Sequence, residues 1–182
     1  VDGYVSWDGD GTENDKVHAL SLLPINYKFL DYSYSIRGCS LQTFHRDVTS
    51  SQNAMHTKHP TYTFIKYLYN GDHLSIIPGS FDSWVPFTAA HNIKGNLGKC
   101  ILFNSNAIHA GMPNKIGYSR HVIQYKVAHF DDMHKLESLT DNHTYKVGDC
   151  NQNWIKKNFL RFFSYHFSFV TDIFTTILQK RQ

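Results

Sequence analysis

The sequence lacks the residue patterns that would indicate a disulfide framework or a nucleic-acid partner. Its cysteines are only three, Cys39, Cys100 and Cys150, an odd number without CxxC spacing. This pattern argues against a disulfide framework and against a structural zinc site, and it favours a reducing, intracellular and cytoplasmic location. The net charge is only +3 and no long lysine and arginine block occurs, so we expect no nucleic-acid partner.

Secretory signals and long apolar runs are also missing. The chain begins at Val1 without a charged and apolar leader, which predicts no signal peptide. Its most apolar segment, the tail, is interrupted by Arg161, His166 and Asp172, which argues against a membrane span. With 182 residues, 41% hydrophobic and 18% charged, the sequence predicts one globular domain over residues 1–182.

Aromatic residues, in contrast, are abundant at 15% and favour strands. Short apolar or alternating runs lie between about residues 35 and 130, separated by clusters of Gly, Pro, Asn and Asp. This pattern predicts a mainly β protein, a sandwich or barrel. Residues 1–15 are expected to form a turn-containing lead-in. The expected strands are 35–44, 62–69, 74–77, 99–103 and 120–127.

The tail changes its period and predicts an amphipathic helix over about 153–179. Its apolar residues, among them Ile155, Phe159 and Phe162, recur at spacings of three and four. Polar residues such as Arg161 and Ser164 lie away from them. We expect the apolar face to pack on the outside of the β core. The alternative is that it contacts a membrane or a second subunit.

The first chemically informative motif is His45-Arg46-Asp47. In a strand, residues i and i+2 point to the same face, so the imidazole and the carboxylate can converge on one metal ion. His109 follows the apolar run Ile101-Leu102-Phe103 and is the best candidate for a third ligand. Two histidines and one carboxylate form the facial triad of Fe(II) oxygenases, which leaves positions open for a cosubstrate and dioxygen.

Arg120, at the start of the last expected strand, is the candidate for binding a cosubstrate carboxylate. Its planar guanidinium can form a bidentate pair with a carboxylate, which Lys cannot match. Each residue alone is weak evidence in a chain with 12 histidines. A single His45 or His109 is more often a packing or loop histidine, and a single Arg120 is more often a surface residue. Their order within a β-rich chain makes the combination much stronger.

Together these segments resemble the phytanoyl-CoA dioxygenase-like family. The resemblance covers roughly residues 41–127 and is carried by the following stretches: Phe44-His45-Arg46-Asp47, Leu74-Ser75-Ile76-Ile77-Pro78-Gly79-Ser80, Gly98-Lys99-Cys100-Ile101-Leu102-Phe103 leading to His109, and Pro113-Asn114 followed by Arg120. It implies a double-stranded β-helix, a jelly-roll or cupin-like barrel, with a few flanking helices. It also implies iron bound by His45, Asp47 and His109, with Arg120 binding 2-oxoglutarate.

The implied reaction needs Fe(II), 2-oxoglutarate and O2, with ascorbate as a supporting reductant, and releases succinate and CO2 as a substrate is hydroxylated. Some positions depart from the family pattern. Phe81 follows Pro-Gly-Ser where the family usually has histidine, and Lys99 stands where an acidic residue is common. Tyr62 is the expected replacement for a tryptophan that lines the cosubstrate pocket.

The substrate is not indicated by any motif. A small or lipid-like molecule is the first expectation and a protein side chain the second. Two other functions fit the same residues: a cupin-like metalloenzyme that does not use 2-oxoglutarate, and a non-catalytic barrel that acts as a binding module. An Arg120→Ala change should abolish 2-oxoglutarate binding in a 2-oxoglutarate enzyme and leave the metal chemistry of the first alternative intact. Absence of a bound first-row metal would favour the second alternative.

Overall fold

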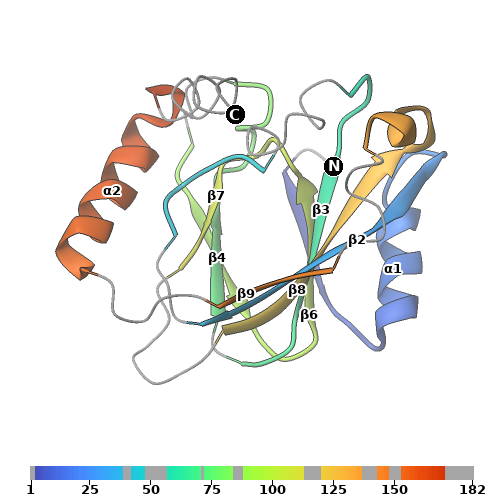
Figure 1. The fold of residues 1–182 in the computed structure, drawn as a ribbon, viewed down its shortest axis with the longest axis horizontal. Helices are drawn as coiled ribbons and strands as arrows, with labels where there is room; N and C mark the ends of the chain where they lie inside the picture. Colours follow the sequence, from blue (N-terminus) through green and yellow to red (C-terminus); the bar gives the residue numbers. More distant parts are fainter. Residues whose placement is uncertain are drawn as a thin grey trace.

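The computed structural model describes residues 3–38, 42–47, 57–70, 72–83, 88–112, 120–136, 143–147 and 153–170. Figure 1 shows their arrangement. In chain order the elements are β1 (Tyr4–Asp8), α1 (Thr12–Ser21), β2 (Tyr27–Gly38), β3 (Tyr62–Tyr67), β4 (Asp72–Ile76), β5 (His91–Gly95), β6 (Lys99–Asn104), β7 (His109–Gly111), β8 (Arg120–His129), the 3-10 helix η2 (Phe130–Lys135), β9 (His143–Val147) and α2 (Trp154–His166).

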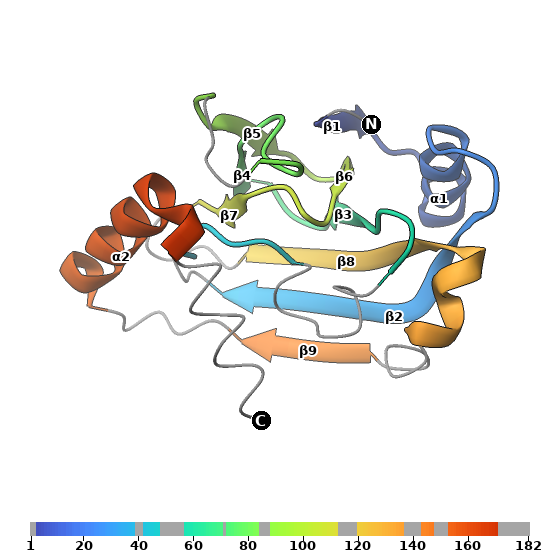
Figure 2. The same ribbon diagram turned by 90° about the horizontal axis from the view of Figure 1, so that it is seen from above.

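The described strands form two sheets. The first is six-stranded in the order β1-β6-β3-β8-β2-β9, and the second is three-stranded in the order β5-β4-β7. Pairing is antiparallel except between β2 and β9. From β3 the chain crosses to the β4–β5 hairpin of the second sheet, returns to the first at β6, crosses again to β7 and returns at β8; Figure 2 shows the two sheets from above. The mainly β prediction is confirmed, and the arrangement is compatible with a cupin-like fold.

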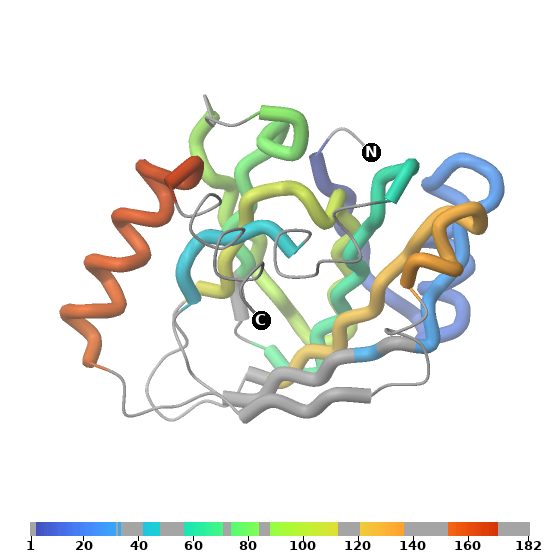
Figure 3. The backbone as a smooth tube through the Cα atoms, turned by 45° about the horizontal axis from the view of Figure 1, so that its top comes forward, coloured from blue at the N-terminus to red at the C-terminus, as the bar shows by residue number. Residues whose placement is uncertain are grey.

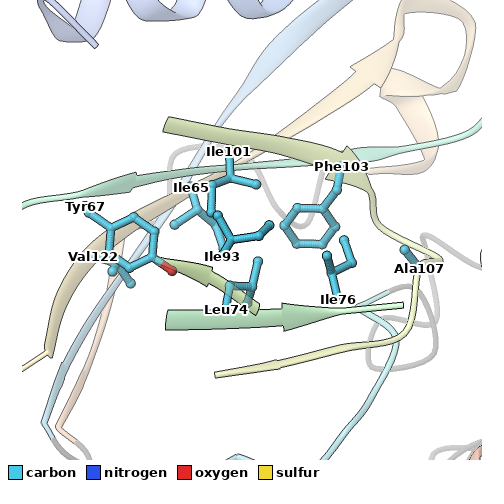
Figure 4. Packing of buried hydrophobic residues seen from close by; sticks show 9 residues of the cluster. All are labelled: Ile65, Tyr67, Leu74, Ile76, Ile93, Ile101, Phe103, Ala107 and Val122. Atoms are coloured by element: carbon cyan, nitrogen blue, oxygen red, sulfur yellow. The ribbon is translucent and has the colours of Figure 1, made fainter. Parts of the chain in front are cut away.

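An apolar core fills the space between the two sheets (Figure 4). Ile65 and Tyr67 of β3 face Leu74 and Ile76 of β4 across this space. Because side chains alternate along a strand, the odd residues of β3 enter the core and the even residues point outward. The remaining members of the cluster are Ile93, Ile101, Phe103, Ala107 and Val122.

The N-terminal elements add an edge strand to the six-stranded sheet and place a helix against its outer face. Regular structure begins within the expected lead-in of residues 1–15: β1 pairs with β6, and α1 already begins at Thr12. Ala19 of α1 packs with Phe64 and Leu102 in a second apolar cluster. The lead-in prediction was wrong because Tyr4–Asp8 pairs with β6 and forms an edge strand of the six-stranded sheet.

A buried ion pair fastens α1 to this face. The Lys66 ammonium donates to Asp15, which is 1% exposed. Burial alone would raise the pKa of Asp15, but hydrogen bonds from Lys66 and Cys100 outweigh it and lower the pKa below its usual value. Removing one partner of such a pair leaves a buried, unpaired charge.

Asp15→Ala is therefore expected to lower the free energy of unfolding by about 3 kcal/mol, measured by urea denaturation. Glu13→Ala is the matched control, because Glu13 forms an exposed pair with Lys16 on the same helix. That change should cost less than about 1 kcal/mol. Equal losses in the two variants would show that the buried pair contributes nothing beyond a surface one.

The C-terminal helix α2 lies on the opposite side of the sheets from α1 (Figures 1 and 3). The predicted helix forms over Trp154–His166, and residues 171–179 of the prediction lie outside the described part. Its expected packing was wrong: Phe159 and Phe162 are exposed, whereas Arg161 and Ser164 contact the β core. None of the described helices is long and apolar enough to cross a membrane.

Candidate metal centre

Two short segments bring the predicted metal ligands together. His45 and His109 form an isolated antiparallel bridge, in which each backbone N–H donates to the other residue's carbonyl at 2.9 Å. The backbone N–H of Asp47 donates to Ser105 O on the same neighbouring segment. Because His45 and Asp47 are two residues apart in an extended segment, both side chains point toward the His109 ring.

Backbone hydrogen bonds orient both imidazoles. Nδ1 of His45 lies 2.9 Å from Thr43 O, and Nδ1 of His109 lies 2.9 Å from Ala107 O. A carbonyl can only accept, so each Nδ1 carries the proton and each Nε2 presents a lone pair. Histidine ligands to a metal usually donate their other ring N–H to a carbonyl or carboxylate in this way.

The ligand atoms are close enough for one ion. Nε2 of His45 is 3.6 Å from Oδ1 of Asp47, and Nε2 of His109 is 3.4 Å from the same oxygen. Two ligands about 2.1 Å from a metal and at right angles to each other lie about 3 Å apart. A contraction of a few tenths of an ångström would bring each nitrogen to that distance from Oδ1, and all three ligand atoms lie within 4.8 Å of one another, so the residues fit the implied group.

Burial and nearby charges favour the metal-binding protonation states of Asp47 and His109, whereas they raise the pKa of His45. Burial alone would raise the pKa of Asp47, but the Lys126 ammonium and the two histidines outweigh it and hold the pKa well below its usual range. Burial lowers the pKa of His109, whereas Asp47 raises that of His45 against the effect of burial. Near neutral pH the carboxylate is therefore ionised and the His109 ring is neutral.

The second oxygen of Asp47 is held by three side chains that the sequence did not indicate. Oδ2 accepts hydrogen bonds from Lys126 Nζ at 2.7 Å, Thr63 Oγ1 at 2.8 Å and Gln124 Nε2 at 3.2 Å. Lys126 also donates to Thr63 Oγ1 at 2.8 Å. These bonds leave Oδ1 facing the histidines. Gln124 and Lys126 are two residues apart on β8, so they lie on one face of the strand. This spacing was the only feature of the sequence that could have indicated their role.

Lys126→Met is expected to weaken metal binding about 10- to 100-fold, because residues that hydrogen-bond to a metal ligand commonly contribute that much to affinity. Losing the ammonium also raises the pKa of Asp47, so the affinity should begin to fall at a higher pH during acidification. Isothermal titration with Fe(II) under anaerobic conditions at several pH values measures both effects. Lys94→Met, on the exposed part of β5, is the control and should bind like the wild type.

The Pro-Gly-Ser segment supports the strand that carries His109. Gly79 has a φ of +73°, a left-handed conformation that favours glycine and lets the chain turn after Pro78. The Ser80 hydroxyl then donates to Ile77 O at 2.6 Å and accepts from Ile108 N at 2.8 Å. Ser80 thereby fixes the backbone immediately before His109.

Arg46, between the two ligands of the first motif, points the other way and is 5% exposed. Its guanidinium donates to the carbonyls of Ser80, Ser83 and Asn106. Arg46 therefore ties the loop after β4 to the loop before β7. Strand alternation could have predicted its direction, but its partners depend on tertiary structure.

The two predicted cosubstrate residues are placed differently from the triad. Tyr62 packs in the cluster beneath α1, with its ring 5.4 Å from that of Tyr27, so the structure does not bring it to the metal ligands. Its neighbour Thr63 points to Asp47 instead. Arg120 is the first residue of β8 and pairs with Gly38. Its side chain lies outside the described part of the structure.

A second group of potential ligands lies at the other end of β8. His59 and His129 are close to Asp131, an acidic partner that sequence analysis did not assign to them. The two imidazoles stack with centroids 3.8 Å apart and planes at 28°. Stacked rings direct their in-plane lone pairs side by side and not toward one point. This geometry fits packing better than shared metal coordination.

No family model and no curated protein sequence matches the chain. Among solved structures, the chain is similar to a non-haem monooxygenase, ThoJ, in a nickel complex, at 14% identity and a TM-score of 0.51. That match covers 63% of this chain and 49% of ThoJ, so the chain spans about half the length of that protein. HygX from Streptomyces hygroscopicus, with nickel and 2-oxoglutarate bound, matches at 15% identity over 63% of each chain, with a TM-score of 0.46. At this identity the likeness to ThoJ shows the fold alone.

Proposed function

We propose that the protein is an Fe(II)- and 2-oxoglutarate-dependent dioxygenase. The observation that carries the proposal is the triad itself, in which two Nε2 atoms and one carboxylate oxygen converge on one point. Such a set binds Fe(II) on one face and leaves the opposite positions open. The bound metal and 2-oxo acid would supply oxidative decarboxylation to succinate and CO2, coupled to oxidation of a substrate.

The residues around the triad have defined roles in this proposal. His45, Asp47 and His109 hold the metal, and Lys126, Thr63 and Gln124 keep Asp47 in a single orientation. Arg120 opens the strand that carries Gln124 and Lys126, and it is proposed to bind the remote carboxylate of 2-oxoglutarate as a bidentate pair. The apolar core between the sheets shields the reacting atoms from water.

The proposed fold is more specific than a cupin-like arrangement. Between β3 and β8 the chain crosses between the two sheets four times, with β4 and β5 paired in the smaller sheet, and the His45–His109 bridge adds a segment beside β7. This path is what a double-stranded β-helix requires. Together with the segments that resemble the phytanoyl-CoA dioxygenase-like family, it supports a place near that family. Asp47 occupies a ligand position with a carboxylate, which favours hydroxylation over halogenation.

The direct test is turnover of 2-oxoglutarate. Purified protein with ferrous iron, ascorbate, O2 and 2-oxoglutarate should release succinate slowly even without a substrate, and omission of iron should stop it. A metalloenzyme of the cupin type that does not use 2-oxoglutarate would bind metal but release no succinate. A non-catalytic barrel would contain no first-row metal after anaerobic purification.

A further inference from the structure

The C-terminal helix presents its apolar side to solvent. Ile155 is 84% exposed, Phe159 66% and Phe162 60%, although these residues define the apolar face of the helix. The other exposed apolar residues of the segment are Trp154, Leu160, Phe163, Phe167 and Phe169. At 3.6 residues per turn the members within α2 span roughly two-thirds of the helix circumference. Contiguous exposed apolar surfaces of this kind mark interaction sites.

Specific polar contacts hold the helix in this orientation. The Arg161 guanidinium donates to Gln42 O at 2.7 Å and Gly111 O at 3.0 Å, and it lies over the Phe44 ring at 4.5 Å. Ser164, 1% exposed, accepts from the backbone N–H of Phe44 at 2.9 Å. Turning the apolar face inward would break these bonds and leave the buried N–H of Phe44 without its acceptor, so the outward orientation is the one that the contacts favour.

The charge and composition of this face match an anionic bilayer surface. Residues 153–170 contain no aspartate or glutamate, whereas Lys156 and Lys157 lie in the first turns beside Trp154. A pair of helices would need only a narrow apolar seam. A broad aromatic surface with lysines at one end of the helix is typical of helices that lie in the headgroup region of a membrane. Long lysine side chains can reach lipid phosphates while their stems stay apolar.

We propose that the outward face of α2 and of the residues that follow it, from Trp154 to Phe169, is a membrane-contact surface that lies on bilayers containing anionic phospholipid. The helix lies parallel to the bilayer, with Ile155, Phe159 and Phe162 inserted among the acyl chains. Its inward residues stay bonded to the segment that leads into His45, so the β core is held at a fixed orientation on the membrane. This contact requires neither metal nor 2-oxoglutarate, and it stands or falls independently of the proposed reaction.

The test is cosedimentation of the full-length protein with phosphatidylcholine vesicles, with and without phosphatidylserine. The wild type should bind the phosphatidylserine vesicles, and added salt should weaken the binding. Phe159→Ser/Phe162→Ser should lower the partition coefficient at least about tenfold. Lys156→Gln/Lys157→Gln should lower it about tenfold on phosphatidylserine vesicles, with little change on phosphatidylcholine alone.

The matched control is Ile25→Ser/Leu97→Ser, which removes two apolar side chains that are 86% and 65% exposed elsewhere on the molecule. This control should bind vesicles like the wild type, and circular dichroism should show that every variant is folded. Absence of wild-type binding, or equal binding by Phe159→Ser/Phe162→Ser, would overturn the proposal. One further result would overturn it: the wild type does not bind vesicles but is a dimer in light scattering, and Phe159→Ser/Phe162→Ser dissociates that dimer. The face would then contact a second copy of the chain.

Discussion

Asp47→Ala is expected to remove Fe(II) binding and 2-oxoglutarate turnover together. Asp47 supplies the only anionic ligand of the triad, and its Oδ1 lies within 3.6 Å of both histidine Nε2 atoms. Substituting a residue that only hydrogen-bonds to a metal ligand costs about 10- to 100-fold in metal affinity. Loss of a ligand itself should therefore lower the affinity more than about 100-fold. Anaerobic titration with Fe(II) and a succinate assay measure the two effects.

The same substitution leaves Lys126 without its carboxylate partner, so folding has to be checked separately. Asp47→Asn keeps the size of the side chain and its hydrogen-bonding capacity, and it should remain folded while binding iron poorly. Asp8→Ala, at an exposed site on β1, is the control for loss of an aspartate. Normal turnover in a folded Asp47→Ala protein would rule out the proposed metal site.

Arg120→Ala is expected to raise the KM for 2-oxoglutarate while leaving iron binding unchanged. Loss of a bidentate partner for a buried carboxylate typically costs about 2–3 kcal/mol, which corresponds to roughly 30- to 150-fold in affinity. Arg120→Lys keeps the charge but not the fork of donors, so its KM should lie between those of the wild type and the alanine variant. Steady-state succinate release over a range of 2-oxoglutarate concentrations gives the comparison.

This pair of variants also separates the proposed enzyme from a cupin-like enzyme that does not use 2-oxoglutarate. If Arg120→Ala and the wild type bind 2-oxoglutarate equally, Arg120 does not hold the cosubstrate. The ammonium of Lys126, already beside the metal ligands, would then be the next residue to test. If neither protein binds 2-oxoglutarate but both bind metal, the cupin-like alternative is favoured.

Much of the site could be predicted because its geometry is local. The i and i+2 spacing of His45 and Asp47 sets both on one face of an extended segment, wherever the rest of the chain lies. Lys126 could not be predicted in the same way. Its contact with Asp47 depends on the register between β3 and β8, which pairs Thr63 with Lys126 across 63 residues of sequence. Tyr62 does not lie at the triad because side chains alternate along β3, and the side chain that points inward at this place is that of its neighbour Thr63.

The helical tail shows a different limit of prediction from sequence. Its period of three and four identified the apolar face correctly, but periodicity does not say which side of a helix packs. Here Arg161 and Ser164 find hydrogen-bonding partners at Phe44 and Gly111, and these contacts turn the polar side inward. The short strands β5 and β9 were missed because their sequences are polar and resemble loops.

The central claim is that this site binds Fe(II) and 2-oxoglutarate as one chelate. Anaerobic addition of both to the purified protein should produce a visible metal-to-ligand charge-transfer band, because the 2-oxo acid binds iron through its keto oxygen and adjacent carboxylate. The band should be absent in Asp47→Ala, and in Arg120→Ala it should need a much higher 2-oxoglutarate concentration. A wild-type protein that binds Fe(II) but shows no band at saturating 2-oxoglutarate would contradict the claim.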